Sequence, residues 1–74
     1  MSAAEIPVTP ETFPAQLKEL REEQELSQQK LAKRAQVSQQ TISAIENGRV
    51  EPSLPILVAL AVALGVVLRL GKLR

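Results

Sequence analysis

The stretch that decides the fold is SQQTISAIENG, residues 38–48. Ser38 is a favoured N-cap, and Gly48 is a favoured stop signal, so the stretch predicts one short helix. Gln39 and Gln40 stand side by side in its first turn. Glutamine is neutral, and its distinctive property is a paired hydrogen-bond donor and acceptor. The question is therefore what these two amides bind.

A second capped helix comes just before this stretch. Ser27 is a good N-cap, and Leu26 and Leu31 have the spacing of a hydrophobic staple around it. Two short helices, here over 28–35 and 39–46, joined by a three-residue turn are the signature of a helix-turn-helix. In that motif the second helix enters the DNA major groove and presents its N-terminal residues to base edges. A Gln amide can bind adenine in a bidentate manner, which gives Gln39 and Gln40 a role.

Helical spacing and capping residues predict two further helices. Phe13, Leu17 and Leu20 recur on one helical face, and Ser53 and Gly65 are of the types that begin and end a helix. The four predicted helices span 14–24, 28–35, 39–46 and 54–64. The side chains expected to face inward from the second and third helices are Leu31, Ala32, Ala35, Ile42 and Ile45.

The chain divides into three parts. Residues 1–12 have little periodic apolar pattern and predict an extended, mobile arm. Residues 13–65 form the helix-turn-helix domain, and residues 66–74 form a tail with a role in dimerisation. Within the tail, VVLRL is β-branched and partly alternating, which favours a short strand, although a fifth helix stays open as the alternative.

Composition excludes several classes of function. The 74 residues fit one domain, and no Cys or His is present to form a disulfide, a metal site or a nucleophilic catalytic site. We therefore expect no enzyme activity, no cofactor and no metal. One Phe without Tyr or Trp argues against binding of single strands by base stacking.

Two segments bear on location. The first residues carry no signal-peptide pattern, and the apolar run at 56–68 is shorter than a membrane span and is interrupted by Gly65. We expect no membrane association and a cytoplasmic location on the nucleoid.

Charge is unevenly distributed along the chain. The net charge is −4 over residues 1–26, +3 over residues 27–50 and +2 over residues 51–74. A polyanion would therefore prefer the middle of the chain, where the two short helices lie.

The chain resembles the Cro/C1-type helix-turn-helix family, also called the XRE family, over Leu17–Val66. The pieces that carry this resemblance are Leu20-Arg21, Leu26-Ser27-Gln28, Leu31-Ala32, VSQQTIS at 37–43, IENG at 45–48, Pro52-Ser53 and ALGV at 63–66. It implies an all-α, compact four-helix bundle like the lambda repressor domain, bound to double-stranded operator DNA as a homodimer. The tail looks like that of the HipB-type antitoxins, whose C-terminal strands pair across the dimer.

The resemblance also assigns roles to residues. Gln28 has a further expected role, bracing the first Gln of the third helix. Arg21 and Glu46 resemble the family's structural ion pair. At Glu25 and Gln36 the family often has Gly, so both are expected at turn or left-handed positions. The expected base contacts are Gln39, Gln40, Ser43 and Ala44. The expected phosphate contacts are Ser27, Gln28, Ser38, Asn47 and Arg49.

The last helix has more apolar surface than one core can use. One stripe is expected to face the bundle, and it consists of Leu54, Leu57, Val58, Ala61 and Leu64. The other stripe is expected to join the tail in the dimer interface. The residues predicted for that interface are Ile56, Ala59, Leu60, Ala63, Val66, Val67 and Leu68.

Two functions follow from these observations. The first is a sequence-specific transcriptional repressor that binds a pseudo-palindromic operator as a homodimer, including the antitoxin of a toxin–antitoxin pair. The alternative is a protein-interaction module, an antitoxin or adaptor, whose main partner is another protein such as a toxin. The resemblance implies a bacterial, phage or plasmid origin.

Overall fold

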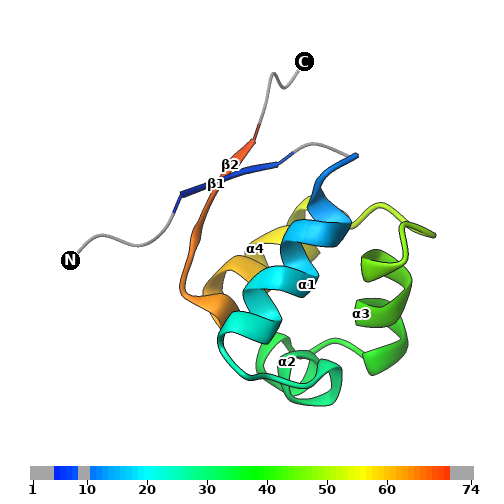
Figure 1. The fold of residues 1–74 in the computed structure, drawn as a ribbon. Coiled ribbons are helices and arrows are strands. Elements are labelled where there is room, and N and C mark those ends of the chain that lie inside the picture. Colours follow the sequence, from blue (N-terminus) through cyan, green and yellow to red (C-terminus); the bar gives the residue numbers. More distant parts are fainter. Residues whose placement is uncertain (1–4, 9–10, 71–74) are drawn as a thin grey trace.

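The computed structural model describes residues 5–8 and 11–70, which form four helices and a pair of short strands (Figure 1). Helix α2 packs against α3 and α4, and α1 packs against α3. The helical part is therefore the predicted all-α helix-turn-helix bundle. The elements are β1 (Glu5–Val8), α1 (Phe13–Glu23), α2 (Gln28–Ala35), α3 (Gln39–Glu46), α4 (Leu54–Leu64) and β2 (Val67–Leu70).

Capping residues set the predicted helix bounds. The Oγ of Ser27 accepts the backbone N–H of Lys30 at 3.0 Å, and the Oγ of Ser38 accepts that of Thr41 at 3.0 Å. Gly65 ends α4 in the left-handed conformation, with φ at 68°. Helices α2, α3 and α4 have the predicted bounds, whereas α1 begins and ends one residue earlier than predicted.

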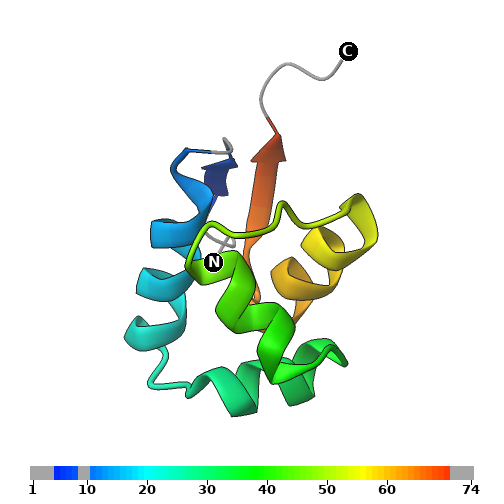
Figure 2. The same ribbon diagram turned by 90° about the vertical axis from the view of Figure 1, so that its right-hand side faces the viewer.

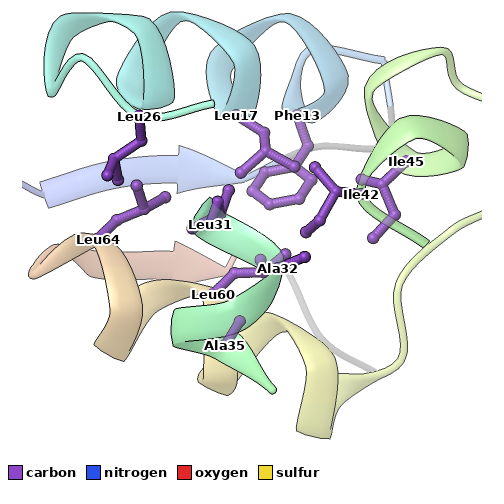
Figure 3. Close-up of a cluster of buried hydrophobic side chains, with 10 residues drawn as sticks. All are labelled: Phe13, Leu17, Leu26, Leu31, Ala32, Ala35, Ile42, Ile45, Leu60 and Leu64. Carbon is purple, nitrogen blue, oxygen red and sulfur yellow. The ribbon is translucent and has the colours of Figure 1, made fainter. Parts of the chain in front are cut away.

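The core lies where all four helices meet, and Figure 3 shows its side chains pointing toward one another. The five inward residues predicted for α2 and α3 are all buried, which confirms the helical spacing used to choose them. The Nε2 of Gln24 donates to the carbonyl oxygen of Leu64 at 2.7 Å and ties the end of α1 to the end of α4. The buried cluster consists of Phe13, Leu17, Leu26, Leu31, Ala32, Ala35, Ile42, Ile45, Leu60 and Leu64.

The burial of α4 differs from the prediction at several positions, although Leu64, predicted to face the bundle, is buried and Leu57 packs against the core. Leu60, predicted in the dimer interface, is 1% exposed and belongs to the core, whereas Leu54 and Val58, predicted to face the bundle, are 57% and 54% exposed. The physical reason is that LPILVALAVAL is apolar on every side, so periodicity cannot tell which side is buried. Val62 is 76% exposed and completes a row with Leu54 and Val58 at a spacing of four residues.

The strand predicted in the tail is present as β2, but it has a partner within its own chain. Strand β1 pairs with β2 in parallel, from Glu5 opposite Val67 to Val8 opposite Leu70 (Figure 1). The resemblance implied that this strand pairs across a dimer, whereas the structure pairs it with β1 of the same chain. Residues 5–8 form a strand where an extended arm was expected. The pairing gives backbone groups of both segments a hydrogen-bonding partner. The remaining parts of the predicted arm and tail, residues 1–4, 9–10 and 71–74, lie outside the described residues.

Candidate DNA-binding surface

Helix α3 lies on the outside of the molecule, where Figure 2 shows it in front of the other helices. Its inner face is fixed in the core by Ile42 and Ile45, each 0% exposed. Its first turn presents Gln39 and Gln40 as exposed side chains, and no group within residues 5–8 and 11–70 binds either amide. Both amides are therefore free to bind a ligand.

The other predicted base contacts follow one turn later on α3. Ser43 and Ala44 are half-buried, so each has an accessible face. The Oγ of Ser43 accepts a hydrogen bond from the Nδ2 of Asn47 at 3.3 Å. Gln40, Ser43, Ala44 and Asn47 are spaced by three or four residues and so form one continuous strip on the helix surface.

Thr41 is a residue that the sequence analysis did not single out. Its hydroxyl lies 2.8 Å from that of Ser38, and its N–H donates to the same Ser38 oxygen. Each hydroxyl carries one hydrogen, and the hydrogen bond between the two hydroxyls uses only one of these two hydrogens. One O–H therefore stays available to donate outward at the start of α3. The signal that could have found Thr41 is the spacing of an N-cap residue and a polar residue three positions later.

The predicted phosphate contacts lie at three places, one of which is Ser38 at the start of α3. Ser27 and Gln28 begin α2, whereas Asn47 and Arg49 lie at the end of α3 and in the loop after it. Ser27 and Arg49 are exposed, and Gly48 between Asn47 and Arg49 has φ at 71°, so the chain turns sharply there. The Nε2 of Gln28 donates to Glu46 at 3.1 Å, so the structure shows this amide bonded to Glu46 and not bracing Gln39.

Arg21 and Glu46 form the predicted ion pair between α1 and α3. The Arg21 Nε and Nη2 donate to the two Glu46 carboxylate oxygens at 2.7 and 3.0 Å, and Nη1 donates to the Leu26 carbonyl at 2.8 Å. The hydrogen bond to Glu46 raises the pKa of Arg21, and burial opposes it. The Arg21 guanidinium therefore stays charged at every ordinary pH. The role of the ion pair is structural, because it links α1 to α3.

Charge is segregated on the described surface. Three exposed basic side chains, Lys30, Lys33 and Arg34, lie on α2, and Arg49 follows α3. One further exposed basic side chain, Lys18, lies on α1. Exposed acidic side chains gather on α1 and the turn after it, at Glu19, Glu22, Glu23 and Glu25. The two helices of the predicted DNA-binding motif are thus the more attractive surface for a polyanion.

Residues 5–8 and 11–70 contain no cluster of three or more metal-ligating acidic, His or Cys side chains. No helix within those ranges has the length and apolar character needed to cross a membrane.

The sequence pattern of the helix-turn-helix family matches residues 17–69, which is well over half of the chain and contains the whole of α2 and α3. The chain belongs to the Cro/C1-type helix-turn-helix family. Among curated protein sequences, none matches this family member significantly.

Two solved regulators are similar to this helix-turn-helix protein. The restriction-modification controller protein C.AhdI from Aeromonas hydrophila is 33% identical, with a TM-score of 0.73 over 74% of this chain and 83% of its own. Two structures of the clp gene regulator ClgR from Corynebacterium glutamicum are each 31% identical with TM-scores of 0.74. They match 82% and 84% of this chain, which spans 65% and 80% of theirs.

The two neighbours are a controller protein and a gene regulator. Together with the exposed first turn of α3, they identify the helix-turn-helix protein as a DNA-binding transcription regulator.

Proposed function

We propose that this helix-turn-helix protein is a sequence-specific transcriptional repressor that reads double-stranded operator DNA with the first turn of α3. The single observation that carries the proposal is the pair of exposed amides at Gln39 and Gln40, which have no partner in the described structure. Each amide can donate to adenine N7 and accept from adenine N6 at the same time. Ser43 and Ala44 would extend the contact along the groove, with Ala44 against a thymine methyl group.

Phosphate contacts would fix the register of α3 on the duplex. Ser27 and Ser38 stand at helix N-termini, where backbone N–H groups and the helix dipole favour an anion. The hydroxyl pair of Ser38 and Thr41 also has one O–H left to donate to a phosphate. Asn47 and Arg49, both exposed, would bind the phosphate backbone at the other end of α3. Such contacts supply most of the affinity for any DNA sequence and little of the discrimination between sequences.

A homodimer would use the exposed apolar row on α4. Leu54, Val58 and Val62 are more than half exposed, and Val67 on β2 is 50% exposed. Contiguous exposed apolar surface of this kind marks an interface, and a two-fold interface matches a pseudo-palindromic operator with half-sites about 34 Å apart. This row replaces the predicted interface around Leu60, which is buried.

Substitution of either glutamine tests the proposed readout. The specific probe is a duplex of about 30 base pairs selected by the wild-type chain from a randomised pool, and the control probe is its scrambled sequence. We expect Gln39→Ala and Gln40→Ala each to weaken binding to the selected duplex by about 1–3 kcal/mol and to leave binding to the scrambled duplex nearly unchanged.

The matched control is Gln29→Ala, since Gln29 is exposed in the first turn of α2. It should affect neither duplex. If the two α3 variants weakened both duplexes equally, the amides would be positioning groups and the proposed base readout would be wrong.

A second candidate function is a protein-interaction module, the antitoxin of a toxin or an adaptor. The exposed row on α4 supports it, because another protein would cover that row as well as a second copy would. Purification from the native cell separates the two functions. A stoichiometric second protein that masks the α4 row supports the module, whereas recovery of the chain alone as a dimer supports the repressor.

A further inference from the structure

The amide of Gln28 joins the first residue of α2 to the last residue of α3. Its Nε2 donates to the Oε1 of Glu46 at 3.1 Å, across 18 positions of sequence. The same carboxylate also accepts the Nε and Nη2 of Arg21. One carboxylate therefore holds α1, α2 and α3 together at a single point.

The acceptor at this point fixes which way the Gln28 amide lies. A carboxylate can only accept hydrogen bonds, so the nitrogen of Gln28 must face Glu46 and the oxygen must face away. The Glu46 side chain is 3% exposed and that of Arg21 is 10% exposed, so water competes little for these bonds. Hydrogen bonds to an ionised, poorly hydrated acceptor are the stronger kind.

Helix α3 is short enough for this bond to control its orientation. Glu46 lies seven residues, about two turns, after Gln39, so the two side chains leave α3 on the same side. Ile42 and Ile45 hold the inner face of the helix in the core. The bonds to Glu46 then limit how far the helix can rotate about its own axis, and with it the direction of Gln39.

We infer that Gln28 is a positioning residue for DNA readout, acting through Glu46 on the orientation of α3 and not by contact with a phosphate. The inference rests on the proposed readout by Gln39 and Gln40. A positioning residue affects discrimination between sequences, because it aims the side chains that touch bases. A phosphate contact affects every sequence alike.

The first test replaces the donor while keeping the length of the side chain. Gln28→Met is compared with wild type and with Gln29→Met, which changes an exposed neighbour on the same turn. The probes are the selected and scrambled duplexes described above, and circular dichroism confirms that each variant is folded. Gln28→Met should lose about tenfold in affinity for the selected duplex, as for one lost base contact, and little for the scrambled duplex. Gln29→Met should lose neither.

The second test makes the bond between residue 28 and Glu46 depend on pH. It can also be used if Gln28→Met fails to fold. In Gln28→Glu the introduced carboxylate faces Glu46, which also binds Arg21, so repulsion between the two carboxylates breaks the bond to Glu46 at neutral pH. Once protonated, the introduced carboxyl group can donate its O–H to Glu46 as the glutamine N–H did. Selectivity, the ratio of the two affinities, should therefore recover between about pH 8 and about pH 5. In wild type and in Gln29→Glu, selectivity should change little over this range.

Each other outcome overturns the inference. Equal losses for both duplexes in Gln28→Met would make Gln28 a phosphate contact, and no loss would make its bond to Glu46 irrelevant to DNA. If the selectivity of Gln28→Glu stayed constant with pH, the bond between residue 28 and Glu46 would likewise be irrelevant to DNA readout. If the wild-type chain selected no preferred duplex, the proposed function itself would fail. If it selected one and only the Gln28 results disagreed, the positioning role alone would fail.

Discussion

Two single residues hold backbone conformations that suit glycine better. Glu25 has φ at 57° and Gln36 has φ at 61°, which confirms the left-handed or turn conformations predicted for both. The positive φ brings the Cβ close to the following carbonyl oxygen, at a cost of about 1 kcal/mol or more. The chain keeps larger residues here, at the turns that precede α2 and α3, and so forgoes some stability.

Gln36→Gly should raise the free energy of unfolding by about 0.5–1 kcal/mol, because relief of the strain exceeds the greater backbone entropy of glycine when unfolded. Urea unfolding followed by circular dichroism measures this. The matched control is Gln29→Gly, inside α2, which should lower the same quantity by about 1 kcal/mol. A loss of stability in both variants would mean that the side chain of Gln36 contributes more than its backbone costs.

Helix α4 shows, at the scale of an element, how burial divides an entirely apolar sequence. Leu60 and Val62 are two residues apart, yet the first is 1% exposed and the second is 76% exposed. Leu60 therefore stabilises the fold of its own chain, whereas Val62 is exposed and can contact another chain.

Substitutions at Leu60 and at Val62 separate the folding of one chain from the association of two. Leu60→Ala should lower the free energy of unfolding by about 2–5 kcal/mol, because it leaves a cavity in the core. Val62→Lys should change it by only about 0.5 kcal/mol or less, since the site is at the surface. In sedimentation at micromolar concentration, Val62→Lys should shift the chain from dimer to monomer. A Val62→Lys chain that stays dimeric would place the interface elsewhere.

Other elements differ in how far their sequence predicts them. Ser27 and Ser38 mark the starts of α2 and α3 because a cap is a local interaction. Ser53 precedes α4 at the predicted position, but its side chain makes no capping hydrogen bond. Strand β1 could not be found in this way, because EIPV is short, contains Pro7 and pairs with a segment at the other end of the domain. The bond between Gln28 and Glu46 was missed for the same reason, since periodicity describes one helix and not the contact between two.

The charge distribution determines which side of the whole molecule attracts a polyanion. Exposed acidic side chains outnumber the exposed Lys18 on α1, whereas α2 and the loop after α3 carry the exposed Lys30, Lys33, Arg34 and Arg49. This arrangement orients the molecule so that α2 and the loop after α3, and not α1, approach a polyanion.

The salt dependence of binding reports this orientation. Arg49→Ala should weaken binding to the selected and scrambled duplexes alike, and it should lower the slope of log affinity against log salt by about one. Fluorescence anisotropy at several salt concentrations measures the slope. Lys18→Ala, on the acidic helix α1, removes the same charge and should change the slope much less. An equal change in both variants would assign Arg49 only a long-range effect.

The ribosome synthesises β1 long before β2, so the two strands cannot pair until β2 has been synthesised. Strand β1 begins at Glu5, and its partner begins at Val67, 62 residues later. At about 5–20 residues per second, β1 waits roughly 3–12 seconds for that partner to be synthesised. During this interval an unpaired strand is a template for pairing with a neighbouring nascent chain. Its length of four residues and its proline, Pro7, are the features that keep such pairing weak until β2 arrives.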